Sequence, residues 1–181
     1  MKTYPQDKPR FSRRLTYAAA MLCAALAFSY LEAILPLSLI IPLPGVKLGL
    51  ANLAVMLAFF CLCPADAALI SASRIFLSAL LFGSPVSFIF SFFGGALSYF
   101  SMFLTRPLIR HGRMSFVGAS VVSSALHSLG QICAAALLYG VGAFMYLSVI
   151  LIFGTFFGAL IGLLLNILYP KTEKIINEKN S

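Results

Sequence analysis

Six apolar runs, each bounded by charged residues, proline or glycine, dominate this sequence. They cover residues 15–35, 47–62, 65–82, 86–104, 115–139 and 143–168. About 20 helical residues cross the hydrocarbon core of a bilayer, and most of these runs approach or exceed that length. Only helices and closed barrels satisfy their backbone polar groups in lipid, and the runs lack the alternation of barrel strands. The sequence therefore predicts an all-α membrane protein, a six-helix transmembrane bundle.

The composition excludes a water-soluble globular domain. Hydrophobic residues make up 61% of the 181 residues and charged residues 10%, whereas soluble domains carry roughly 25% charged residues. The net charge of +8 does not indicate nucleic acid, because the basic residues lie in short flanks between apolar runs and form no basic face. We expect the lipid bilayer, and no nucleic acid, as a partner.

The basic residues predict the orientation of the bundle, since cytoplasmic loops are enriched in Lys and Arg. With six spans, the three segments that carry 11 of the 13 basic residues fall on one side. We therefore expect a multi-pass membrane protein with both termini cytoplasmic; the localisation that we expect, the bacterial plasma membrane, comes from the family resemblance described below. Residues 1–14 would be a basic flank, 15–168 one transmembrane domain and 169–181 a tail. The basic residues in question are Lys2, Lys8, Arg10, Arg13, Arg14, Arg106, Arg110, Arg113, Lys171, Lys174 and Lys179.

The first run has an alternative interpretation as a signal peptide. A basic flank precedes it, and Ala25-Leu26-Ala27 resembles a cleavage site. Cleavage would leave five spans and would place the basic 106–113 loop opposite the side that the N-terminal flank marks. We favour a retained first helix, because it keeps the basic residues on one side.

Small residues at helical spacing predict where helices pack closely, since association in lipid depends on close backbone approach. Gly154, Gly158 and Gly162 recur every four residues in the sixth run, which predicts a tight contact with another helix. Ala20 and Ala24 have the same spacing in the first run. Packing within the bundle is one interpretation of each stripe, and docking of another subunit on the first helix is the other.

Polar side chains at membrane depth are costly and therefore mark candidate functional positions. Arg74 lies near the middle of the third run, and His127 lies at mid-depth in the fifth with Gln131 one turn away. The others lie toward the outer ends of the first two runs. Together the sequence predicts one polar set, comprising Glu32, Lys47, Asn52, Arg74, His127 and Gln131.

Two interpretations of this polar set remain open. In the first, Glu32 forms a structural ion pair with Arg74 or Lys47, and the other side chains only hydrogen-bond between helices. In the second, the set lines an outward-facing ligand pocket, where two cations against one carboxylate favour an anionic ligand with an apolar or aromatic portion. The proline-rich apolar segment 36–46 would then fold back over the pocket as a lid.

No catalytic constellation is present in the sequence. Paired carboxylates for metal-dependent diphosphate chemistry are absent, as is a phosphate-binding glycine loop, and Cys61-Leu62-Cys63 lacks the spacing of a metal or redox pair. We expect no enzymatic activity, no catalytic or metal-binding residues and no cofactor.

The run from Pro44 to Leu53, PGVKLGLANL, enters the second apolar segment after the proline-rich stretch. It resembles the signature of the Gx transporter family, also known as heptaprenyl diphosphate synthase component I. The resemblance covers essentially the whole chain. That family is in turn similar to the substrate-binding S components of energy-coupling factor (ECF) importers, six-helix proteins that bind vitamins or related micronutrients at the outer side.

The resemblance implies a membrane-embedded S component that binds a vitamin-like molecule or an isoprenoid or quinone precursor. It also implies that Ala20 and Ala24 contact a coupling transmembrane subunit, and that separate ATPase subunits hydrolyse ATP. An alternative is an accessory membrane subunit associated with heptaprenyl diphosphate synthesis, which would act through the cytoplasmic loop 106–113 and the tail. A third possibility is a stand-alone facilitator that works as an oligomer.

Overall fold

The computed structural model describes residues 11–35 and 47–178. In these residues it contains helices and no strand. The elements are α1 (Phe11–Ile34), α2 (Asn52–Cys61), α3 (Pro64–Phe82), α4 (Pro85–Arg110), α5 (Phe116–Tyr139), the 3₁₀ helix η2 (Val141–Tyr146) and α6 (Leu147–Glu178). The expected all-α architecture of about six helices is confirmed. The predicted lid, residues 36–46, lies outside the described residues.

Five of these helices are long and apolar enough to cross a membrane. The chain is therefore a multi-pass membrane protein by the length and composition of its helices. The exception is α2, whose 10 residues span only about 15 Å, half of a hydrocarbon core. The second apolar run was expected to be helical from residue 47, but residues 47–51 do not belong to the helix.

The helix ends follow from local sequence. Ser84 and Ser115 precede α4 and α5, and each side chain accepts a hydrogen bond from the backbone N–H three residues later, at 3.1 Å in both cases. Gly140 ends α5 with φ +87°, a conformation that favours glycine. At the other end of the chain, α6 continues past the sixth apolar run to Glu178.

The centre of the bundle is the short helix α2. Nine of its residues are buried, and it packs against α1, α3, α4 and α6. A helix that is apolar on every face is stable only where other helices surround it. Phe59 and Phe60 are fully buried there and contact each other edge to face at 5.3 Å between ring centroids.

The glycine stripe of α6 lies against α5, in the most extensive helix contact together with α4–α5. A Cβ atom on Gly158 would lie 2.6 Å from the hydroxyl of Ser124, and one on Gly162 would lie 2.5 Å from Cα of Val117. A Cβ on Gly154 would overlap Ser128. The stripe therefore packs within the bundle, the first of the two interpretations above.

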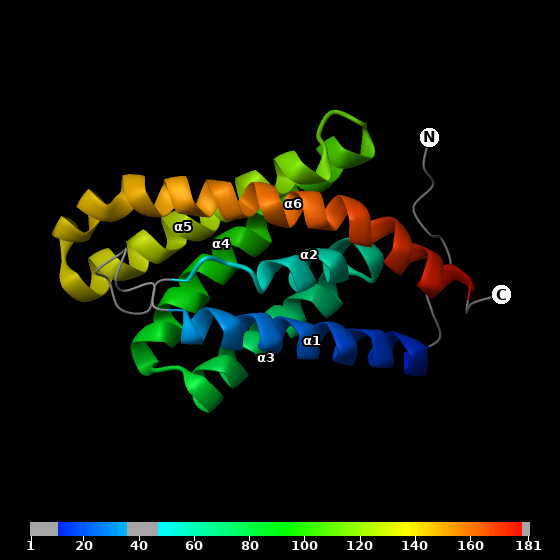
Figure 1. Cartoon of the computed structure of the whole chain (residues 1–181), viewed down its shortest axis with the longest axis horizontal. Helices are drawn as coiled ribbons and strands as arrows, with labels where there is room; N and C mark the ends of the chain where they lie inside the picture. The colour runs from blue at the N-terminus through cyan, green and yellow to red at the C-terminus, as the bar shows by residue number, and fades with distance from the viewer. Residues whose placement is uncertain (1–10, 36–46, 179–181) are drawn as a thin grey trace.

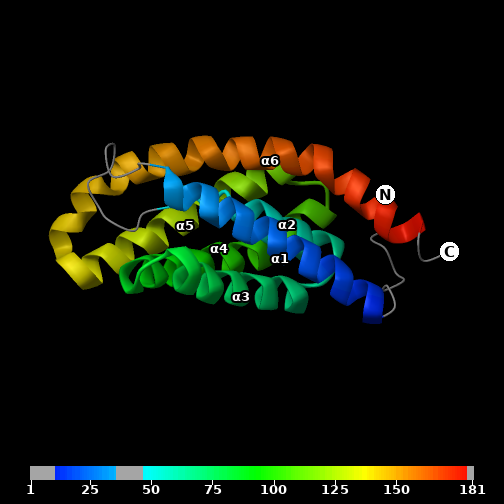
Figure 2. The ribbon, with the colours of Figure 1, turned by 60° about the horizontal axis from the view of Figure 1, so that its bottom comes forward.

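The arrangement of the helices agrees with the distribution of basic residues. Figure 1 shows that the start of α1, the α4–α5 loop and the end of α6 lie toward one end of the bundle. The α5–η2 turn lies at the opposite end, and the view in Figure 2 shows the same division. We refer to the first as the basic end and to the second as the opposite end. That the basic end is cytoplasmic stays a prediction.

Candidate functional site

The polar side chains singled out in the sequence converge between α1, α3, α4 and α5, at the start of α2. All except Lys47 are nearly inaccessible, with exposed fractions between 0% and 4%, and Lys47 is half-buried. They form two adjoining groups. The first group, which we call the polar cluster, consists of Glu32, Lys47, Arg74, His127 and Gln131.

The segment that precedes α2 is fixed by side chains of neighbouring helices. Gln131 of α5 pairs with the backbone of Lys47 in both directions: its Oε1 accepts from the N–H at 3.2 Å, and its Nε2 donates to the C=O at 2.8 Å. The backbone N–H of Leu50 donates to Oε1 of Glu32 at 2.6 Å. These bonds satisfy backbone groups that would otherwise belong to the first turn of a helix, which explains why α2 begins only at Asn52.

His127 lies between two glycines. Its ring is 3.5 Å from the position of a Cβ on Gly49, which has φ +85°, and 2.8 Å from that of a Cβ on Gly94. Nε2 of His127 is 2.7 Å from Nε2 of Gln131. One hydrogen of the Gln131 amide is donated to the carbonyl of Lys47. The other is donated to Nε2 of His127, so the neutral ring carries its proton on Nδ1.

The charges of the polar cluster are not paired with one another. In the described part of the chain, Glu32 forms no ion pair with Lys47 or Arg74, although both cations act on it electrostatically. Arg74 makes one long hydrogen bond, 3.4 Å from Nη1 to Oγ of Ser29. The structural ion pair considered above is therefore not formed.

Backbone groups of Gly49 and Gly94 lie near Glu32 and His127, but four buried polar atoms in this region form no hydrogen bond of good geometry. They are Oε2 of Glu32, Nε of Arg74, Oγ of Ser91 and Nδ1 of His127, on α1, α3, α4 and α5. Gly94 and Gly95, one turn beyond Ser91 on α4, lie beside His127 and Arg74. Buried polar groups are almost always satisfied, so a concentration of exceptions is typical of a site that a ligand completes.

Asn52 belongs to the second group, one turn toward the basic end. Its Nδ2 donates to the hydroxyls of Ser98 on α4 and, at 3.3 Å, Ser123 on α5. Those hydroxyls are 2.7 Å apart. Asn52 thus connects α2 to α4 and α5 by hydrogen bonds next to the polar cluster. The two serines were not predicted, although each lies one helical turn from Gly94 or His127 in the sequence.

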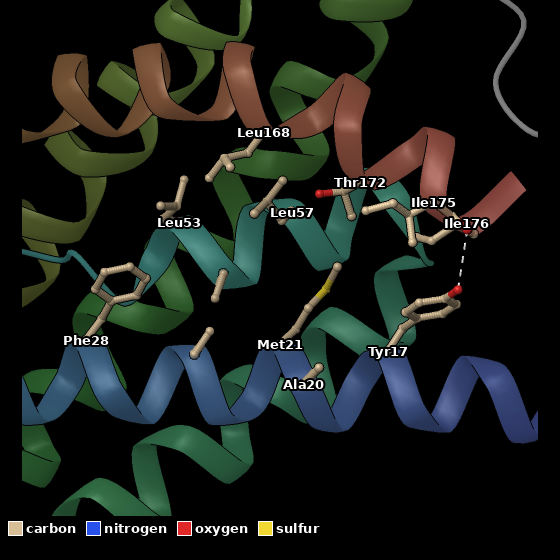
Figure 3. Close-up of a pocket in the computed structure, with 12 residues that line it drawn as sticks. Tyr17, Ala20, Met21, Phe28, Leu53, Leu57, Leu168, Thr172, Ile175 and Ile176 are labelled. Atoms are coloured by element: carbon tan, nitrogen blue, oxygen red, sulfur yellow. Dashed lines mark hydrogen bonds between the residues drawn. The ribbon is translucent and has the colours of Figure 1, made fainter. Parts of the chain in front are cut away.

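Ala20 and Ala24 line an apolar groove and are themselves exposed. The groove has a volume of about 370 Å³. Its walls are α1 and α6, and α2 forms its floor, where Leu53 and Leu57 are located (Figure 3). Sequence analysis predicted a docking face on α1 but gave no sign that α6 forms its other side.

An ion pair at the basic end was also missed by sequence analysis, which assigned Arg14 to the topology signal alone. Nε and Nη2 of Arg14 donate to the two carboxylate oxygens of Asp66 at 2.6 and 2.7 Å. Nη2 is also 2.8 Å from Sγ of Cys63. The pair joins the start of α1 to the first turn of α3. A contact between residues so distant in sequence leaves no local signal.

We expect Asp66→Asn to lower the free energy of unfolding by about 1 kcal/mol, because a bidentate pair is lost but Arg14 is partly solvated. The arginine side chain is 31% exposed. Denaturant unfolding in detergent would measure the change, with Arg14→Gln and the double variant completing a mutant cycle. Exposed Arg13→Gln is the control. Additive effects of the two single variants would contradict the pairing.

The family model of heptaprenyl diphosphate synthase component I matches residues 21–168 of the 181. The chain belongs to this family. The match begins within α1 and ends within α6, so it includes the polar cluster and most of the groove. No curated protein and no solved structure matches the chain.

Membership of this family agrees with the resemblance found in the PGVKLGLANL motif. The structure gives the described part of that motif a physical role, because Lys47 and Gly49 contact α5, Leu50 contacts α1, and Asn52 contacts α4. The glycine adopts a positive φ, and the others connect the chain to α5, α1 and α4. The described part of the motif, residues 47–53, therefore forms one side of the polar cluster.

Proposed function

We propose that this protein is a membrane-embedded substrate-binding subunit of an ECF-type importer. The observation that carries the proposal is the set of four unpartnered polar atoms, on four helices, beside three charged side chains without an ion pair among them. Such a set is costly in a membrane and is favourable only when a bound molecule supplies the missing partners. The protein itself would catalyse no reaction.

The proposed ligand is a small anionic or amphipathic molecule, either vitamin-like or an isoprenoid or quinone precursor. Two cations against one carboxylate leave the polar cluster with a positive charge that an anionic group would balance. Glu32 would orient a cation or accept a hydrogen bond from the ligand. Asn52, whose amide nitrogen binds Ser98 and Ser123, would form part of the wall of the site.

The groove at Ala20 and Ala24 is the proposed docking surface for a coupling transmembrane subunit, with ATPase subunits on its cytoplasmic side. Ala20→Trp combined with Ala24→Trp should abolish co-purification of a coupling subunit, because the two indoles would fill the groove. Binding of the ligand should be retained, since the polar cluster lies on the other side of α2's first turn. Phe76→Trp, on the exposed face of α3, is the control.

Co-purification that survives the double substitution would contradict the docking claim. The experiment is a pull-down from native membranes with tagged protein. A coupling subunit and ATPases in the eluate would support the importer.

The second candidate is an accessory membrane subunit in heptaprenyl diphosphate synthesis, which the description of the family favours. It would act through the loop between α4 and α5 and through the end of α6. The same pull-down separates the two candidates, because this role predicts prenyl synthase chains in the eluate in place of ATPases.

A further inference from the structure

The groove between α1 and α6 differs from an ordinary lipid-facing surface in being enclosed on three sides. The backbones of the described α1 and α6 do not pack on each other. At the basic end, a hydrogen bond from the Tyr17 hydroxyl to the carbonyl of Ile175, at 3.5 Å, joins the two helices (Figure 3). The volume of about 370 Å³ lies at the lower end of ligand sites, which measure about 300–1,000 Å³.

The lining of the groove is chemically asymmetric. Alanine, leucine and phenylalanine side chains cover its length, and its polar side chains, Tyr17 and Thr172, both lie toward the basic end. Small residues on α1 and α2 leave room for a chain that lies along the helices. Such a groove in a bilayer accepts hydrocarbon and excludes water.

Two exposed cations lie close in sequence to the residues that line this polar end. Arg13 precedes Tyr17 by four residues on α1, and Lys171 lies three residues after Leu168 and four before Ile175 on α6. Residues three and four apart share a helix face, so helix periodicity places Arg13 on the face of Tyr17, and Lys171 on the face of Leu168 and Ile175. The groove is thus apolar along its length and carries two hydroxyls, with a cation near each wall, at one end. This division matches that of a phosphate-bearing lipid.

We propose that the groove binds one acyl chain of an anionic phospholipid, with its phosphate between Arg13 and Lys171. The hydroxyls of Tyr17 and Thr172 lie at the level where the glycerol and phosphate oxygens would be. A coupling subunit that docks at Ala20 and Ala24 would have to displace this lipid. The assignment does not rest on the importer role, because it uses only the groove and its charged end.

The chain contains no tryptophan, so a single introduced indole reports on its own surroundings. Phe28→Trp places one in the groove, and Phe76→Trp places one on the exposed face of α3 as a control. The probes are phosphatidylglycerol and phosphatidylcholine brominated on the acyl chain, which quench indole fluorescence on contact. Purified protein is reconstituted with either lipid in mixtures with unlabelled phosphatidylcholine.

We expect brominated phosphatidylglycerol to quench the groove indole at lower mole fraction than brominated phosphatidylcholine, and both to quench the control indole equally. Lys171→Gln should weaken the preference roughly fivefold, the effect of one basic residue near an anionic lipid. Arg113→Gln, which removes an equally exposed charge from the α4–α5 loop, should leave it unchanged. Leu168→Trp on α6 provides a second reporter.

Equal quenching of the groove indole by the two lipids would overturn the proposal, because the groove would then be ordinary lipid surface. Absence of quenching by both lipids would also overturn it, since the groove would then be closed or filled by protein. Relief of the phosphatidylglycerol signal by low concentrations of farnesyl diphosphate would replace the phospholipid with an isoprenoid diphosphate. A weaker preference for phosphatidylglycerol in Lys171→Gln, with an unchanged preference in Arg113→Gln, would support the phospholipid proposal.

Discussion

Gly158→Leu should lower the free energy of unfolding by about 3 kcal/mol, the upper range for overpacked sites. A Cβ at this position would lie 2.6 Å from Oγ and 2.7 Å from Cβ of Ser124, and 3.2 Å from the backbone oxygen of Ser120. The carbonyl belongs to helix α5 and cannot move without it. The helices must therefore separate along their main contact. Denaturant titration in detergent micelles, followed by circular dichroism, measures the change.

Thr155→Leu is the matched control, because Thr155 lies on the same helix but is exposed and should tolerate an apolar side chain in lipid. A second series tests the contact itself. Gly158→Ala should be destabilising alone and less so in combination with Ser124→Gly, which removes the atoms that the new methyl group meets. Equal effects of Gly158→Leu and Thr155→Leu would show that α5 and α6 do not pack as described.

Arg74→Leu should reduce the affinity for the co-purifying ligand roughly 10- to 100-fold, the value of a lost hydrogen bond to a charged group. The side chain is 2% exposed, and its Nε has no partner. The proposed ligand supplies the missing acceptor. The affinity is measured by displacement or, before the ligand is identified, by the amount retained per protein.

The same substitution separates a binding role from a structural one. Arg74 has one hydrogen bond of 3.4 Å and no ion pair among the described residues. Its removal therefore relieves the cost of a buried charge, and this gain offsets the lost attraction to Glu32, which Lys47 also compensates. The unliganded protein should therefore unfold at the same or a higher denaturant concentration. Arg113→Leu, an exposed arginine outside the bundle, serves as control. A structural arginine would instead give lower stability with unchanged retention.

The helices could be predicted because apolar runs of bilayer length permit little else. The exception is instructive. Residues 47–51 begin the second apolar run. However, Gly49 adopts a positive φ, and Gln131 and Glu32 bind the backbone on either side of it. Those partners come from α5 and α1, so hydropathy alone could not place the start of α2.

The candidate site was partly predictable for a similar reason. Polar residues in a membrane are rare enough that each one stands out, and the structure brings five of the six together. What the sequence could not predict is how they pair. Glu32 binds a backbone N–H and not a cation. Asn52 binds Ser98 and Ser123, which nothing in the sequence distinguishes from the other serines of the chain.

The ion pair between Arg14 and Asp66 could not be predicted from the sequence either. Arg14 already had an explanation as part of the topology signal, and Asp66 has no local pattern that marks it as a partner. Their contact depends on how α1 packs against α3, which no local pattern specifies. The apolar groove between α1 and α6 is likewise a product of packing, because each wall alone is an ordinary apolar helix face.

The central claim is that the polar cluster binds a small molecule, and mass spectrometry of molecules that co-purify with the protein tests it most directly. Wild-type protein and the Arg113→Leu control should carry the same anionic or amphipathic compound in near-stoichiometric amount. Arg74→Leu protein should remain folded and carry little of this compound. Lys47→Met protein should also remain folded and show a smaller loss. Equal retention of that compound by folded wild-type, Arg74→Leu and Lys47→Met protein would contradict the claim.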